Sequence, residues 1–117
     1  MTNASREQFP REHRIAGSRE YRAIYDAGVK VNSASFVLFG RTNSLEHHRL
    51  GLTVTRRVGG AVVRNRVKRL FREVFRKSSE EIPHHFDLIV NAKRSAATVA
   101  FESLRNEFVS AARKLCR

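Results

Sequence analysis

The sequence contains few of the residues that form covalent or metal cross-links. Its 117 residues include one cysteine, Cys116, two prolines and no tryptophan. A single cysteine cannot form an internal disulfide or a thiolate zinc site. Two histidine pairs, His47-His48 and His84-His85, are adjacent in sequence and lack the i, i+4 spacing of metal ligands on a helix. We therefore predict no metal site, and we interpret these pairs as exposed loop residues.

Long apolar runs are also missing. No stretch approaches the roughly 20 residues that span a bilayer, and the polar segment 1–14 does not fit a secretory signal peptide. We expect a cytoplasmic protein with no membrane-spanning segment. Hydrophobic residues still make up 41% of the chain, enough for a folded core. The length predicts a single domain over residues 14–117, after a basic, mobile lead-in over residues 1–13.

Acidic residues are scarce, with 11 Asp+Glu against 23 Lys+Arg and a net charge of +12. Such a charge disfavours the compact state by self-repulsion, so we expect a polyanionic partner, either nucleic acid or an anionic membrane. Asp26 and Asp87 are the only aspartates. Two-metal phosphodiester hydrolysis needs several converging carboxylates, and none of the acids form such a group. We therefore predict that the isolated chain has no nuclease activity and no catalytic residues.

Hydrophobic periodicity predicts a mixed α/β fold. Strand-like alternation gives way to a 3.6-residue period after Gly59-Gly60. Ser18 is expected to cap the first helix and Gly28 to end it. The strands at 35–41 and 50–55 are expected to form an antiparallel hairpin or meander, which 29–32 could begin. The predicted elements are a helix at 18–27, strands at 35–41 and 50–55, a helix at 61–77, a strand at 86–90 and a helix at 98–115.

The basic residues concentrate in one segment, residues 56–77, where Glu73 is the only acid. On a helical wheel the charged positions from 68 to 76 lie opposite the apolar positions. Like charges three or four residues apart repel by ~0.2–0.5 kcal/mol per pair, so this face does not stabilise the helix and indicates a polyanion. Nine of the 23 basic residues lie here: Arg56, Arg57, Arg64, Arg66, Lys68, Arg69, Arg72, Arg76 and Lys77.

The same segment carries a family resemblance. The string RRVGGAVVRNRVKR, residues 56–69, resembles the signature of the bacterial ribonuclease P protein component, and Arg64-Asn65-Arg66 matches its Arg-Asn-Arg motif. Arg14-Ile15, Leu50-Gly51-Leu52 and the segment 87–90 also match, so that the resemblance covers about residues 11–115. This ordered set is far more specific than the motif alone.

The resemblance implies an α+β two-layer sandwich in the order α-β-β-β-α-β-α. Its mixed four-stranded sheet would contain a left-handed βαβ crossover, an exception to the usual right-handed rule. It also implies an accessory subunit of ribonuclease P, the endoribonuclease that removes the 5′ leader of precursor tRNA. The catalyst would be RNA, with Mg²⁺ held mostly by RNA. The implied partners are the catalytic RNA and the leader, with broader substrate range as the result and no obligate protein partner.

Two binding surfaces follow from the resemblance. The leader surface holds Tyr21 and Tyr25 on the first helix and Phe36 on a strand, with core packing as the alternative for all three rings. Arg56 and Arg57 could contact either the leader or the ribozyme. Gly60 departs from the family, which usually has a larger polar or basic residue there. The implied ribozyme contacts are Arg64, Asn65, Arg66, Lys68, Arg69 and Arg72.

Other classes of protein fit parts of the sequence. A structural ribosomal RNA-binding protein would share the charge and the small α/β fold. A membrane-bound amphipathic helix would need the apolar face that the sheet requires, so we expect no membrane partner. A helix-turn-helix DNA-binding protein would need two helices joined by a short turn, but the strand-like residues 50–55 precede the basic helix.

Overall fold

A computed structural model describes residues 11–116, and the backbone alone for Arg11. Residues 1–10 of the predicted lead-in lie outside the described part, and Arg11–His13 form a short 3-10 helix, η2. Two further 3-10 helices are η3, Ser79–Glu81, and η4, Arg94–Ala97. The main elements are α1 (Ser18–Ala27), β1 (Val29–Asn32), β2 (Phe36–Thr42), β3 (Arg49–Thr53), α2 (Ala61–Ser78), β4 (Phe86–Ala92) and α3 (Phe101–Leu115).

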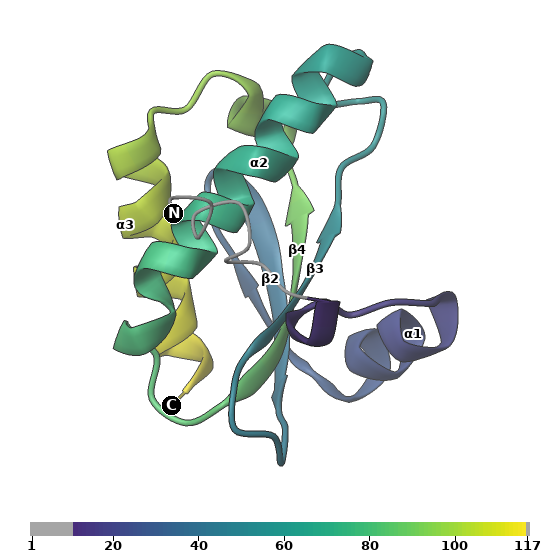
Figure 1. The fold of residues 1–117 in the computed structure, drawn as a ribbon. Helices are drawn as coiled ribbons and strands as arrows, with labels where there is room; N and C mark the ends of the chain where they lie inside the picture. Colours follow the sequence, from purple (N-terminus) through teal and green to yellow (C-terminus); the bar gives the residue numbers. More distant parts are fainter. Residues whose placement is uncertain (1–10, 117) are drawn as a thin grey trace, which may run out of the picture.

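The four strands form one mixed sheet in the order β1-β2-β4-β3. β1 and β2 pair antiparallel, as do β2 and β4, whereas β3 and β4 pair in parallel. In Figure 1, α2 lies in front of the sheet with β3 to the right of β4, and both strands point upward. The crossover β3–α2–β4 is therefore left-handed. The element order and the mixed sheet confirm the fold that the resemblance implies.

One predicted strand pairing is wrong. β2 and β3 do not form a hairpin, because β4 lies between them. The physical reason is burial: residues 86–90 of β4 are all buried, whereas β3 is only partly covered. A strand that is apolar on both faces belongs in the centre of a sheet. Alternation within β3 identifies its two faces, but it does not identify its neighbour.

The main core lies between the sheet and the helices α2 and α3, which pack on the same face (Figure 1). The predicted apolar face of α2 is confirmed, with Val67, Phe71, Val74 and Phe75 buried. From β2, Phe36 enters this core with no exposed surface, and its ring meets Phe71 edge-on at 5.6 Å between centroids. Because this core commits the apolar face of α2, the opposite face of that helix is left for solvent or a partner.

A smaller core forms where α1 covers part of the opposite face of the sheet. Ile24 of α1 is fully buried against Ile89 of β4 and Ile15, and Tyr21, Tyr25 and Phe39 pack around them. Side chains of a strand alternate between faces, so odd-numbered residues of β2 and β4 face α1 and even-numbered residues face α2. This parity decides which residues can line a surface beside α1.

The ends of α1 correct one expectation and explain another. The N-cap is Gly17 at φ 88°, and no side chain caps the helix, so Ser18 is its first residue and not its cap. Gly28 ends the helix as predicted, but its φ of −82° needs no glycine. A Cβ there would lie 2.6 Å from the carbonyl oxygen of Ile24 and 2.8 Å from that of Gly40. The close approach of β2 therefore requires glycine.

The histidine pairs are less exposed than predicted. His48 is buried, and its Nδ1 accepts a hydrogen bond from the Phe86 backbone N–H at 3.0 Å. That bond joins the segment before β3 to the start of β4. His84 and His85 are exposed, as expected, and His47 is half-buried. Within residues 11–116, no helix is long and apolar enough to cross a membrane.

Candidate nucleic-acid interface

Two tyrosine rings of α1 are fixed to the sheet by their hydroxyl groups. The Tyr21 hydroxyl accepts a hydrogen bond from the Leu52 N–H at 3.1 Å. The Tyr25 hydroxyl donates to Asn91 Oδ1 at 2.9 Å and lies 3.3 Å from Thr53 Oγ1. Burial raises the pKa of Tyr21, so its hydroxyl stays protonated over the physiological range. The two rings therefore hold one orientation before any ligand arrives.

The backbone of β3 makes room for the first of these rings. A Cβ on Gly51 would lie 2.7 Å from the Tyr21 hydroxyl oxygen and 2.8 Å from its Cζ. Real side chains do not approach so closely, so any residue larger than glycine would displace the ring. Leu50-Gly51-Leu52, a segment matched to the family in the sequence, thus has a local physical role beside α1.

Two hollows meet at Tyr21. The larger, of about 520 Å³, lies within the size range of small-ligand sites. It is lined by Ser18, Tyr21, Arg22, Tyr25, Asp26 and Thr53. The smaller, of about 130 Å³, is lined by Arg14, Ile15, Tyr21, Leu50, Gly51, Leu52, Lys68 and Arg72. Tyr21 belongs to both, so the surface beside α1 is continuous with the basic face of α2.

The structure corrects one predicted member of the leader surface. Phe36 lies in the main core on the α2 side of the sheet, so its ring cannot stack on a base. Phe39, three residues later, faces α1 instead, and its ring meets Tyr25 edge-on at 4.7 Å. Sequence reasoning chose the wrong side of the strand. Alternation of polar and apolar residues along β2 would have shown which of its residues face α1. Both faces of this strand carry apolar residues, so the sequence contains no such alternation.

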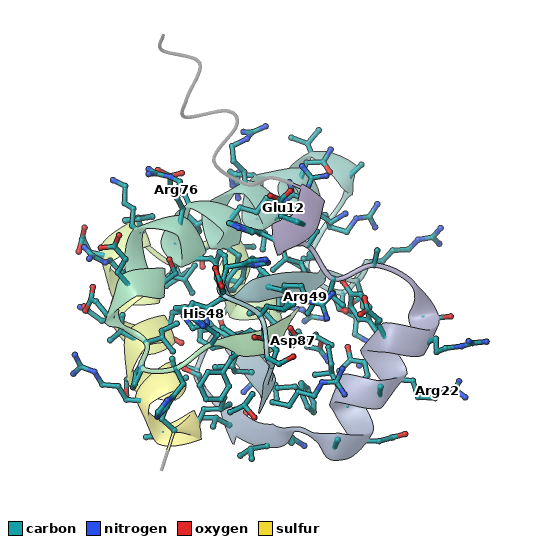
Figure 2. All side chains as sticks on the ribbon, turned by 60° about the horizontal axis from the view of Figure 1, so that its bottom comes forward. Glu12, Arg22, His48, Arg49, Arg76 and Asp87 are labelled. Atoms are coloured by element: carbon teal, nitrogen blue, oxygen red, sulfur yellow. The ribbon has the colours of Figure 1, made fainter. Side chains whose placement is uncertain are left out.

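An ion network holds α1 against the strands. Arg49 of β3 bonds Asp87 of β4 at 2.8 and 2.9 Å and reaches Glu20 of α1 at 3.0 Å. Figure 2 shows Arg49 and Asp87 together at the centre of the molecule. Burial alone would raise the pKa of Asp87, but hydrogen bonds from Arg49 and Asn43 and the charges of Arg49 and Arg41 outweigh it and lower that pKa. Asp87, which the sequence placed in the family-matched segment 87–90, thus has a structural role.

The predicted ribozyme-binding residues lie together on α2. Asn65, Arg66, Arg69 and Arg72 are exposed, and Arg64 and Lys68 are half-buried. The helix begins after Gly60 with no side-chain cap and no acid in its first turn. Both features leave its positive end open to an anion. Burial lowers the pKa of Arg72, and so do the nearby charges of Arg14 and Arg69.

Two contacts connect α2 and the preceding turn to η4. Arg66 donates to the Ala97 carbonyl at 2.8 Å, and Arg94 donates to the Arg57 carbonyl at 3.3 Å. Arg56 and Arg57 are exposed in the turn between β3 and α2, and they do not line either hollow beside Tyr21. The structure therefore adds Arg94 to the basic surface. No motif in the sequence pointed to it.

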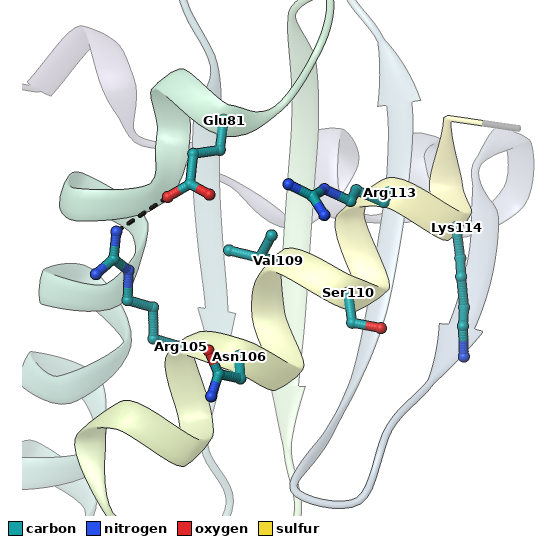
Figure 3. Close-up of a pocket in the computed structure, with 7 residues that line it drawn as sticks. All are labelled: Glu81, Arg105, Asn106, Val109, Ser110, Arg113 and Lys114. Carbon is teal, nitrogen blue, oxygen red and sulfur yellow. Dashed lines mark hydrogen bonds and ion pairs between the residues drawn. The ribbon is translucent and has the colours of Figure 1, made fainter.

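A third hollow, of about 420 Å³, lies on the outer side of α3 (Figure 3). Its lining includes Arg105, which pairs with Glu81 at 2.9 Å, and also Arg113 and Lys114. It belongs to neither predicted surface. The described residues include no group of three His, Cys, Asp or Glu side chains placed to hold a metal ion.

The fold and these surfaces define a class: a small α+β protein with a strongly basic helix face and a preformed aromatic hollow beside it. A family model described as Ribonuclease P matches residues 9–116. The ribonuclease P protein component of Thermotoga petrophila is 39% identical over 84 residues, which are 72% of each chain. The chain therefore belongs to the bacterial ribonuclease P protein family.

Solved structures agree with this membership. The structure of a mutant Staphylococcus aureus RNase P protein superimposes with a TM-score of 0.82 at 27% identity, over 97% of each chain. That of the Thermotoga maritima RNase P protein gives 0.77 at 30% identity, over 86% of this chain and 96% of that one. The chain is thus an accessory subunit of the ribonuclease P endoribonuclease, with the ribonuclease P RNA as its partner. Family membership supports this interpretation of the sequence over that of a ribosomal protein.

Proposed function

We propose that this subunit docks on the ribonuclease P RNA through α2 and holds the single-stranded 5′ leader of precursor tRNA beside α1. The observation that carries the proposal is the continuity of the two surfaces at Tyr21. Tyr21 lines the aromatic hollow, and it also lines the smaller hollow together with Lys68 and Arg72 of α2. A substrate strand in the first would lie next to catalytic RNA on the second.

The aromatic hollow suits a variable strand. A base that stacks on an aromatic ring gains about 1–3 kcal/mol with little dependence on sequence. Tyr21 and Tyr25 supply two fixed rings, 6.3 Å apart between centroids, and Phe39 supports the second. Such a site would raise the affinity for precursor over mature tRNA and accept many leaders. Phe39, and not the predicted Phe36, is the residue of β2 that packs against this site.

The chemistry would remain with the RNA. Two acids beside the sheet, Asp87 and Glu20, are engaged in structure, because both pair with Arg49. We propose that Mg²⁺ at the cleavage site is held mostly by RNA, whose phosphate oxygens are the hard ligands this ion prefers. The protein's part is to position: α2 offsets phosphate repulsion and α1 retains the leader. This role belongs in the cytoplasm, where tRNA precursors are processed.

Holoenzyme assembly tests the docking surface. We expect Arg64→Ala with Arg66→Ala to weaken binding to the cognate ribonuclease P RNA and to flatten its salt dependence, by about one unit of log–log slope per lost phosphate contact. The control is Arg113→Ala with Lys114→Ala on α3, which removes the same charge from another surface. Equal losses in both double variants, or an unchanged slope in the first, would contradict docking through α2.

A further inference from the structure

All five histidines of the chain line one hollow of about 440 Å³. Three segments that are far apart in the sequence supply them, namely η2, the loop before β3 and the loop before β4. Imidazole is the side chain that ordinarily titrates between about pH 5 and about pH 8, so this histidine hollow can change its charge near neutral pH. The residues are His13, His47, His48, His84 and His85.

His48 and the ring of Phe75, on α2, form an uncharged part of the lining. His48 is buried, and its Nδ1 accepts a hydrogen bond from the Phe86 N–H at 3.0 Å, so its proton lies on Nε2. A second proton, on Nδ1, would break that bond. The charge of the hollow therefore depends on the other four histidines, which are exposed or half-buried.

His13 and His47 form a pair of contacting rings, with 4.3 Å between their centroids and 32° between their planes. Nδ1 of His47 lies 3.1 Å from the His48 carbonyl oxygen, which only accepts hydrogen bonds, so this nitrogen carries the hydrogen. In the neutral ring Nε2 is then an acceptor, and protonation makes it a donor. His47 can therefore donate from Nε2 to an anion only after it gains a proton.

Acidic residues set the charge of the hollow while its imidazoles are neutral. Glu46 and Glu80 belong to the lining, and Glu12 precedes His13 in η2. Burial first and the charge of His47 second lower the pKa of His13, and the charge of Glu12 raises it by less. His13 is thus neutral in the free protein at about pH 7, and the two lining carboxylates repel phosphate. Protonation of the four accessible imidazoles would set four positive charges against these two negative ones.

The histidine hollow adjoins the basic face of α2. Arg14 follows His13 in the chain and lines the smaller hollow together with Lys68 and Arg72. Its charge is close enough to Arg72 to lower the pKa of that guanidinium. A strand of RNA on Lys68 and Arg72 would therefore pass Arg14 and bring its next phosphates to the pair formed by His13 and His47.

We infer that His13 and His47 bind a backbone phosphate of the ribonuclease P RNA, and that the pair takes up one proton from solvent when it does so. The proton enters on an imidazole nitrogen, and the resulting N–H donates to a phosphate oxygen. A bound phosphate favours the charged imidazole, so RNA and the proton each raise the affinity of the protein for the other. The inference rests on the proposed docking through α2.

The test is binding of the protein to its cognate ribonuclease P RNA, without precursor tRNA, at about pH 7.5 and about pH 6.0 and at constant salt and Mg²⁺. The unaltered protein should bind about fivefold more tightly at the lower pH, since uptake of one proton changes affinity by at most about tenfold per pH unit. His13→Asn with His47→Asn should abolish this gain and leave the affinity at the higher pH nearly unchanged. His84→Asn is the control, because it removes an exposed imidazole of the same hollow and should keep most of the gain. Circular dichroism checks the fold of each protein at both pH values.

The outcomes separate the inference from the proposed function. An affinity that does not increase at the lower pH, or an increase that the double variant keeps, overturns the inference. So does an equal loss of affinity at both pH values in the double variant, because the pair would then bind RNA without a proton. Failure of Arg64→Ala with Arg66→Ala to weaken binding at the higher pH would overturn docking through α2, and the inference with it.

Discussion

Single residues decide the shape of the surface beside α1. The hydroxyl groups of Tyr21 and Tyr25 bond Leu52 and Asn91, on two neighbouring strands. A phenylalanine at either position would stack equally well but would lose this bond, which is worth about 1 kcal/mol. The hydroxyl groups thus hold the two aromatic rings of α1 in fixed positions against the sheet. The glycine beneath Tyr21 is the other half of this arrangement.

Gly51→Ala should destabilise the fold by about 1–3 kcal/mol, because overpacking forces neighbouring groups to shift. Its new Cβ would lie 2.7 Å from the Tyr21 hydroxyl oxygen. In a Tyr21→Ala background the same change should cost little, since the atoms it meets are gone. Urea unfolding of the four proteins measures this coupling. Equal costs in both backgrounds would show that Gly51 does not make room for Tyr21.

At the scale of elements, strand parity and strand order set the limits of sequence reasoning. The apolar face of α2 and the three helices could be predicted, because a 3.6-residue period identifies a face directly. The face of β2 that points to α1 could not be predicted, since residues 36–39 are apolar on both faces. Either Phe36 or Phe39 could have lined the leader surface. The neighbours of β3 depend on β4, more than 30 residues later in the chain. Long-range burial, and not local pattern, resolves both.

Another long-range contact is the one between His48 and the start of β4. Burial first, and the nearby charge of His85 second, lower the pKa of His48 below its ordinary 6.5. Burial and His47 lower the pKa of His13 as well. Between the lowered pKa of the folded state and the ordinary value of the unfolded state, the unfolded chain therefore binds more protons than the folded chain. Stability should be full above about pH 6.5 and fall as the pH decreases further.

Replacing His48 tests this origin of the pH dependence. His48→Gln keeps an acceptor for the Phe86 N–H but cannot be protonated, so urea unfolding between about pH 7.5 and about pH 5.5 should show a flatter profile. His84→Asn is the control, because His84 is exposed and its φ of 62° suits asparagine. A profile as steep in His48→Gln as in the unaltered protein would assign the effect to other groups.

At the scale of the whole molecule, the net charge of +12 is distributed over two surfaces with different tasks. The basic face of α2 is available because the other face of that helix is committed to the core with α3 and the sheet. The hollow beside α1 contains one arginine and one aspartate, so it adds little charge of its own. We therefore expect affinity for the ribonuclease P RNA to depend strongly on salt, and the extra affinity conferred by the leader to depend on it weakly.

The central claim is that α1 retains the leader while α2 holds the catalytic RNA. The most direct measurement is the affinity of the reconstituted holoenzyme for precursor tRNAs with progressively shorter leaders, compared with mature tRNA. In the unaltered holoenzyme, affinity should fall as the leader is shortened. With Tyr25→Ala it should be nearly independent of leader length, with assembly unchanged. A Tyr25→Ala holoenzyme that keeps the full dependence on the leader would contradict the account.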